Sequence, residues 1–303
     1  MNKLITYFIA IAFIASSCDM VDEPFGPTGA GGWNPGFDQP STFNDTTITR
    51  RRILLEEFTG HTCPNCPKGA DIAEEIKTLF PDDFLSVAVH NSGPFSVPNV
   101  SNPAHPYPSD FRTETGKKLL TKFLIPSFPG GMLNRTQING KYPVDYFRWK
   151  QKVTALLNDP DYVAPRFKLY LKGTYNNEPK NQSVRIKYKV EALQSQTGNF
   201  AIAAYLAESH IIAPQTDSRL PDSYVPDYEH NHVLRVGFPG DGDGKTVFKA
   251  PTKGEVFEAT QESQYLFTKI DETWVAGNMK IIVFVYNSDT GEIFGVEEFE
   301  LTN

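Results

Sequence analysis

The feature that most constrains this chain is the segment Cys63-Pro64-Asn65-Cys66, which lies between a predicted strand and a predicted helix. Residues 53–58 are an apolar run of strand length that ends at Thr59-Gly60. After the cysteines, apolar residues recur at helical spacing until Pro81, and residues 84–89 form a second apolar run. A strand, a helix and a strand within about forty residues predict a βαβ unit, in which the two strands are parallel.

The N-terminus accounts for the first of the chain's 3 cysteines. Lys3 precedes an apolar stretch over residues 4–15 that is too short to span a bilayer, and the small residues 15–17 lead into Cys18. This arrangement resembles a bacterial lipobox, which implies a signal peptide over residues 1–17 and lipidation of Cys18. The alternative is a plain secretory signal with an incidental cysteine. Glycines and prolines without an apolar period then predict a flexible tether over residues 18–50.

With Cys18 assigned to lipidation, Cys63 and Cys66 have only each other as disulfide partners. In an oxidising envelope they form either a redox pair or a short closed loop. Zinc would need two further ligands, and no second cysteine pair or spaced histidine pair lies nearby in the sequence. We expect Pro64 to occupy the first helical turn, so that Cys63 is the more exposed and reactive thiol and Cys66 is shielded.

The pattern of apolar residues changes near residue 160. Helices are predicted over residues 115–123 and 144–157, with a break at residues 125–129 and a strand at residues 131–134. After Pro165 the apolar period is two, which is typical of antiparallel strands with one buried face. These strands are predicted at residues 167–171, 184–190, 200–206 and 280–286, with turns at residues 196–198 and 288–291. We therefore predict one domain over residues 51–160 and an antiparallel β-sandwich, Ig-like or jelly-roll-like, over residues 163–303.

Two segments of the first domain resemble the thioredoxin superfamily. Residues 57–66 are similar to its active-site segment, and residues 122–129 are similar to the later segment that ends in a cis-proline. The resemblance implies an α/β, thioredoxin-like domain with catalytic Cys63 and Cys66. It also implies that Pro129, preceded by Phe128, is the cis-proline against the cysteines; Pro126 is the alternative.

The same resemblance also gives a role to Glu57. It corresponds to the buried acid that takes a proton from the second cysteine of the superfamily. The alternative is an ordinary carboxylate at the wet end of a strand. Thr59-Gly60 stands where the superfamily usually has a bulky aromatic residue.

A narrower resemblance covers residues 50–303. Leu55 to Gly60, the CPNCP run, Pro129 with residues 132–135, and Tyr228 to Arg235 resemble the outer-membrane protein twenty-eight family. This resemblance implies a surface lipoprotein of a Bacteroidetes-type bacterium, located at the outer membrane on either its periplasmic face or the cell surface. The family is associated with adhesion or antigenicity.

Four histidines and one acidic segment have either a functional or an ordinary structural role. His61 precedes the cysteines and His90 follows the second strand, so each is either a residue that supports the site or a solvated loop histidine. His230 and His232 are expected on one strand face, where they would bind a metal only with a third ligand. Residues 241–244 read as a hairpin turn rather than a calcium loop. No metal and no cofactor is predicted.

The formal net charge is -7, which argues against a nucleic-acid partner, because such a partner needs cationic patches. The leading hypothesis is a thiol–disulfide oxidoreductase that acts on envelope or surface proteins and is held to the membrane through Cys18. The alternative is a non-enzymatic adhesin or assembly module, in which Cys63–Cys66 is a structural disulfide.

Overall fold

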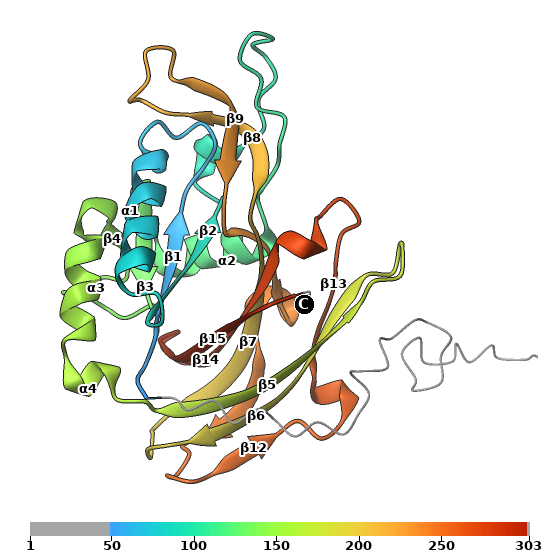
Figure 1. Ribbon diagram of the computed structural model, residues 1–303. Helices are drawn as coiled ribbons and strands as arrows, with labels where there is room; N and C mark the ends of the chain where they lie inside the picture. The colour runs from blue at the N-terminus through green and yellow to red at the C-terminus, as the bar shows by residue number, and fades with distance from the viewer. Residues whose placement is uncertain (1–48, 302–303) are drawn as a thin grey trace, which may run out of the picture.

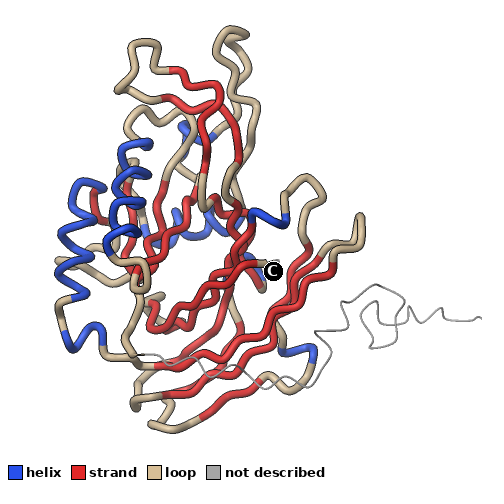
Figure 2. Tube along the Cα trace, in the orientation of Figure 1, coloured by secondary structure: helices blue, strands red, loops and turns tan. Residues whose placement is uncertain are grey.

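The computed structural model describes residues 49–301, and the chain folds as a mixed α/β protein with a large β content (Figures 1 and 2). Strand β1 (Ile53–Phe58) pairs in parallel with β2 (Phe84–Val89), with Ile53 opposite Phe84. Helix α1 (Cys66–Leu79) connects them. The predicted βαβ unit is therefore confirmed.

A nine-stranded sheet forms the centre of the molecule. Its order is β15-β14-β7-β10-β2-β1-β3-β4, and β11 also pairs with β7. The remaining strands of this sheet are β3 (Gly130–Leu133), β4 (Val144–Asp145), β7 (Asn199–Glu208), β10 (Val233–Phe238), β11 (Lys245–Lys249), β14 (Met279–Asn287) and β15 (Ile293–Glu300).

Two smaller sheets complete the β-structure. A four-stranded antiparallel sheet has the order β12-β6-β13, with β5 paired to β6, and β8 and β9 form a separate two-stranded sheet. Their strands are β5 (Phe167–Asn176), β6 (Ser183–Ala192), β12 (Val256–Glu258), β13 (Leu266–Lys269), β8 (Ile211–Thr216) and β9 (Tyr224–His230). The four-stranded sheet shares one apolar core with β7, β10, β11 and β14, to which Phe167, Tyr188, Phe200 and Val283 contribute. The C-terminal half thus contains two β layers packed face to face.

Helices cover both faces of the βαβ part of the central sheet. Helix α1 and helix α3 (Trp149–Leu157) pack on one face through Ile76, Trp149 and Val153. Helix α2 (Glu114–Phe123) packs on the other face through Leu119 and Phe123. The prediction of a helix from residue 144 is wrong at its start, because β4 and a short 3-10 segment, Tyr146–Arg148, precede α3. A short helix, α4 (Pro160–Val163), follows.

The predicted boundary between residues 160 and 163 falls at α4, yet strands from both sides of it lie in one sheet. β10 pairs in parallel with β2 through Val233 and Ala88. One apolar core also combines Leu54 and Val87 with Ala203 and Phe284. The two segments therefore share a sheet and a core. Expression of residues 50–160 and 163–303 as separate chains tests whether either folds alone.

A charged network is buried where these two segments meet. Arg135 donates to both carboxylate oxygens of Glu56, at 2.9 and 2.8 Å, and Tyr205 Oη donates to Glu56 Oε1 at 2.6 Å. Glu56 is 0% exposed and Arg135 is 4% exposed. Glu56 lies on β1 and Tyr205 on β7, so this network ties the N-terminal and C-terminal parts of the sheet together.

The two predicted turns with acidic residues differ in outcome. Residues 288–291 connect the antiparallel strands β14 and β15, as predicted. Residues 241–244 are not a hairpin turn, because β10 and β11 pair one after the other with the same strand, β7. This segment lies in the loop that connects β10 to β11. Lys118 forms ion pairs there with Asp241 and Asp243.

The predicted signal peptide, Cys18 and almost all of the predicted tether lie outside the described residues. Between residues 49 and 301, no helix is both long enough and apolar enough to cross a membrane.

Candidate functional site

Cys63 and Cys66 are joined by a disulfide at the start of α1. Helix α1 begins at Cys66, and Pro67 lies in its first turn. The prediction that Pro64 occupies the first helical turn is therefore wrong: Pro64 belongs to the turn before the helix, and Cys66 is the first helical residue rather than one turn inside.

A segment from the distant β8–β9 hairpin covers this disulfide. We call residues 215–218 the strap. Gln215 Nε2 donates to the carbonyl oxygens of Gly60 and Cys63, at 3.3 and 3.2 Å. The backbone N–H groups of Thr216 and Ser218 donate to His61 O and Pro64 O, at 2.8 and 2.9 Å. Cys63 is 1% exposed and Cys66 is 2% exposed, so the prediction that Cys63 is the more exposed thiol is wrong.

Side-chain contacts hold the strap at both of its ends. Tyr107 Oη lies 2.7 Å from Thr216 Oγ1. Arg219, which follows the strap, forms ion pairs with Asp217 and with Asp71 of α1. Arg219 is partly exposed, so these ion pairs contribute little stability, on the order of 0–1 kcal/mol. The disulfide is thus enclosed by a segment whose outer anchor is weak.

Glu57 is a buried carboxyl group beside this site. It is 4% exposed, and its Oε1 has no hydrogen-bond partner among the described residues. Burial, followed by the charges of Glu74 and Asp71, raises the pKa of Glu57 to about 8. The carboxyl group is therefore mostly protonated at neutral pH. The structure supports the interpretation of Glu57 as a buried acid. It contradicts the interpretation of Glu57 as a carboxylate at the wet end of a strand.

Glu57 and Cys66 both line a cavity of about 270 Å³ between α1, the β1–β2 pair and β9. Its lining is mixed in polarity and comes from two distant parts of the sequence, residues 57–90 and 215–232. Besides Glu57 and Cys66 it consists of Thr59, Pro67, Ala70, Asp71, Ala73, Glu74, Ser86, Ala88, His90, Gln215, Tyr228, Glu229, His230, Asn231 and His232. The strap therefore covers one side of the disulfide, and the cavity lies on the other side, next to Cys66.

The predicted cis-proline is present: the Phe128–Pro129 bond is cis, which confirms that part of the prediction. Pro129 lies against Gly69, three residues beyond Cys66. A Cβ atom on Gly69 would lie 2.8 Å from Glu57 Oε1 and 2.9 Å from Pro129 Cβ, so α1 needs glycine here to approach both residues. The Phe128 ring packs edge to face on Phe95, with 6.4 Å between the ring centroids.

His61 and His90 are buried, so the alternative of a solvated loop histidine is wrong for both. His90 packs on Phe111 and on His230, with ring centroids 5.0 and 5.4 Å apart, and His61 stacks on Tyr107. Burial lowers the pKa of all three histidines, that of His230 to about 4. These imidazoles are therefore neutral at neutral pH.

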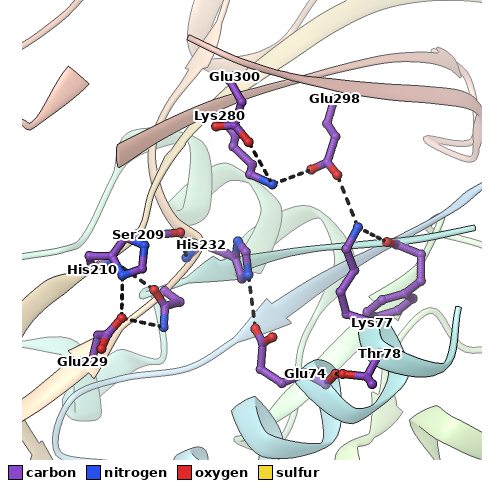
Figure 3. Close-up of polar contacts among 12 residues, drawn as sticks. Glu74, Lys77, Thr78, Ser209, His210, Glu229, His232, Lys280, Glu298 and Glu300 are labelled. Atoms are coloured by element: carbon purple, nitrogen blue, oxygen red, sulfur yellow. Dashed lines mark hydrogen bonds and ion pairs between the residues drawn. The ribbon is translucent and has the colours of Figure 1, made fainter. Parts of the chain in front are cut away.

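His230 and His232 do not share a strand face, which corrects that expectation, because β9 ends at His230 and His232 lies in the turn before β10. His230 belongs to the buried histidine cluster, whereas His232 Nε2 lies 3.1 Å from Glu74 Oε1 on α1 (Figure 3). The hydrogen bond from His232 lowers the pKa of Glu74. In the part of the chain that the structure describes, no group of three or more His, Cys, Asp and Glu residues is placed to hold a metal ion.

The structure thus brings Cys63, Cys66, Glu57, Pro129, His61 and His90 into one region, as sequence reasoning predicted. It adds residues that this reasoning missed: Gln215 over the disulfide, and Glu74 and Tyr228 on the cavity wall. Tyr228 lies in a motif already noted for its family resemblance. Nothing in the sequence around Gln215 or Glu74 marks either residue.

These features define a class: a mixed α/β protein with a CxxC disulfide that opens a helix and is enclosed by a hairpin of its own C-terminal half. The family model of outer membrane protein Omp28 matches residues 117–302. The chain therefore belongs to the Omp28 family of outer membrane proteins. The matched region contains the strap, Pro129 and Arg135, and begins after Cys63, Cys66 and Glu57.

One solved structure extends this result at the level of the fold. HBP35 of Porphyromonas gingivalis is similar with a TM-score of 0.61 at 17% identity, covering 83% of this chain and 76% of that protein. A domain of the outer membrane lipoprotein Omp28 from Porphyromonas gingivalis aligns at 15% identity, covering 45% of this chain and 88% of that domain, with a TM-score of 0.24. No curated protein matches the sequence of this chain. The likeness to HBP35 shows a shared fold.

Proposed function

We propose that this Omp28-family chain is a lipid-anchored thiol–disulfide oxidoreductase with a thioredoxin-like domain over residues 51–160. Its substrates are envelope or surface proteins. The observation that carries the proposal is Glu57, a buried acid on the cavity that Cys66 also lines, whose Oε1 has no hydrogen-bond partner within residues 49–301. Burying a carboxyl group without a partner costs stability, and a disulfide that only closes a loop has no need of a proton donor.

The chemistry assigns one role to each group. A substrate thiolate attacks Cys63 Sγ, a new S–S bond forms, and the electron pair of the Cys63–Cys66 bond leaves on Cys66 Sγ. Protonated Glu57 gives its proton to this Cys66 thiolate. In the reverse direction the Glu57 carboxylate takes the proton from the Cys66 thiol, Cys66 attacks Cys63 Sγ, and the substrate thiolate is released.

The strap must move before this reaction, because both sulfurs are buried beneath it. Three features favour such movement. The strap belongs to a separate two-stranded sheet, its backbone donates only two hydrogen bonds to the turn that holds the cysteines, and its outer ion pair is partly exposed. We expect a substrate protein to reach Cys63 only in this opened state.

A trapping experiment tests the proposal. Cys66→Ser leaves Cys63 unable to be released from a mixed disulfide, so the variant should accumulate disulfide-linked envelope proteins. Cys63→Ser is the matched control, because it removes the attacked sulfur and leaves the buried one. Equal trapping by the two variants, or trapping by neither, would overturn the oxidoreductase.

A second candidate function rests on the burial of the disulfide. In this case the protein is a surface adhesin or assembly module, and Cys63–Cys66 is a structural bridge that also positions the strap. A three-residue separation closes a very small loop, which adds little stability by the loop-closure argument. The trapping experiment separates the two candidates, because a structural bridge traps nothing.

The anchor and the location complete the proposal. Family membership identifies an outer membrane protein. We propose that Cys18 carries the lipid and that the folded body stands off the membrane on residues 18–50. Cys18→Ser should release the protein from membrane fractions, and unchanged partitioning would contradict the lipid anchor.

A further inference from the structure

We propose that Glu74 and His232 form the passage through which Glu57 exchanges its proton with solvent. The two residues are positioning residues that act on the cysteines through Glu57. This inference rests on the proposed function for its purpose, but the passage itself can be tested in the resting disulfide form.

The first observation is that two cavities meet at this pair. The inner cavity, of about 270 Å³, contains Glu57 and Cys66. An outer pocket of about 370 Å³ lies beyond it, and Glu74, Asn231 and His232 line both spaces. The wall between the two spaces therefore consists of these three side chains. Ser209, His210, Gly277, Asn278, Lys280 and Glu300 complete the outer pocket.

The outer pocket is in contact with solvent. The His210 and Glu300 side chains on its rim are 67% and 49% exposed. Figure 3 shows Glu74 on α1 reaching His232 in the β9–β10 turn, with Lys280, Glu298 and Glu300 on the neighbouring strands β14 and β15. A proton that reaches Glu74 or His232 from the inner side thus has direct access to water.

The inner cavity is polar enough to conduct a proton. Glu57 Oε1, His90 Nδ1 and His230 Nε2 are buried, and none has a hydrogen-bond partner among the described residues. All three residues line the inner cavity. A polar cavity of this size holds water molecules that hydrogen-bond to such atoms. We infer that water in this cavity links Glu57 to Glu74.

The other groups that face Glu57 do not offer an equal route. Two other acids line the inner cavity, and each is held in a pair: Asp71 of α1 with Arg219, and Glu229 of β9 with His210. Burial raises the pKa of the Tyr228 phenol to about 12. His90 and His230 pack against Phe111, whose apolar ring closes that side. The strap, through Gln215, closes the side toward Cys63.

Glu74 is the acid that lines both the inner cavity and the outer pocket, and its own surroundings suit a relay. His232 is hydrogen-bonded to it, while Lys77 and Lys280 are the cations that act on it electrostatically. An imidazole beside a carboxylate can accept a proton at one nitrogen and release one at the other. Each time the disulfide opens, the proton that Glu57 gives to Cys66 is replaced from the outer pocket along this path, with no electron transferred in the step.

The rate of proton exchange at Glu57 tests the passage. The full chain is used in its disulfide form, with carbon-13 labels in its glutamate side chains. NMR spectroscopy then follows the Glu57 carboxyl resonance from pH 6 to pH 9. Glu57→Gln identifies the resonance. The passage predicts a single averaged resonance in the unmodified chain. It predicts a broadened or split resonance in Glu74→Gln, with exchange at least ten-fold slower.

His232→Gln is the second variant, in case Glu74→Gln disturbs folding, and Glu75→Gln is the matched control. Glu75 follows Glu74 on α1 but pairs outward with Lys150. Slower exchange in either passage variant with an unchanged control supports the passage. Unchanged or faster exchange in both variants, or equal slowing in the control, overturns it. Cys66→Ser trapping is scored separately, so a failure of the redox function and a failure of the passage are distinguishable.

Discussion

Glu56 and Glu57 are adjacent glutamates on β1, both buried, and they have opposite surroundings. Glu56 faces the core shared with the C-terminal half, where Arg135 and Tyr205 satisfy its carboxylate. Glu57 faces α1 and the cavity beside Cys66, where its Oε1 has no partner within residues 49–301. Successive strand residues point to opposite faces of a sheet, which puts the two carboxyl groups in different environments.

The difference teaches that burial alone does not give a carboxyl group a role. A buried carboxylate that accepts both hydrogen bonds of an arginine fork joins two parts of the fold. A buried carboxyl group without a partner is held in its protonated form and can exchange that proton. Glu56 is therefore a structural acid and Glu57 is the acid available for chemistry.

The largest expected effect comes from breaking the ion pair between Glu56 and Arg135. Glu56→Gln leaves the Arg135 guanidinium buried without a counter-charge, which should cost about 3–5 kcal/mol of folding free energy. Urea denaturation measures this loss. Replacing both partners with apolar residues, as Glu56→Leu with Arg135→Met, should recover most of it. A loss below about 1 kcal/mol in the single variant would show that Glu56 does not hold the fold together.

Glu57→Gln should increase folding stability, and only at higher pH. The folded pKa of Glu57, about 8, lies above its ordinary value of 4.5, so the folded protein keeps a proton that the unfolded chain loses. Stability therefore falls as pH rises from about 4.5 to 8, and Glu57→Gln removes this fall. The variant should be about 2–4 kcal/mol more stable than the unmodified chain at pH 8 and nearly equal to it at pH 4. A difference independent of pH would contradict the raised pKa.

The smallest expected effect concerns the strap. Arg219→Ala removes the partly exposed ion pairs to Asp71 and Asp217, so the strap should open more often while global stability changes by less than about 1 kcal/mol. Reduction of the disulfide by dithiothreitol should become about two- to four-fold faster, since the opening equilibrium shifts by less than 1 kcal/mol. Arg112→Ala is the matched control, because it removes another exposed arginine–aspartate pair, with Asp110. Equal rates for the two variants would show that the strap does not limit access.

The sequence was informative where the structure depends on neighbouring residues. The apolar runs and the helical spacing around Cys63 and Cys66 placed β1, α1 and β2 correctly, because each pattern lies within one element. The sequence alone leaves the environment of Glu57 open between two interpretations. Its burial depends on α1 packing through Gly69 and on β9, which lies about 170 residues later in the chain.

Dependence on residues far away in the sequence also explains the wrong predictions about the cysteines. Their burial comes from Gln215 and its neighbours, which are separated from Cys63 by 152 residues. The sharing of one sheet by both halves depends on the pairing of Val233 with Ala88, and alternating apolar residues predict strands without predicting their partners. Long-range pairing therefore set both the architecture and the enclosure of the site.

The reduction potential of the Cys63–Cys66 disulfide, measured from pH 6 to pH 9 in the unmodified chain and in Glu57→Gln, tests the central claim most directly. An unpaired acid that exchanges its proton with Cys66 predicts a potential above about -300 mV. It also predicts that Glu57→Gln changes the slope of the potential with pH near the pKa of about 8. A potential below about -300 mV, with a slope that Glu57→Gln leaves unchanged, would contradict the account and identify a structural bridge.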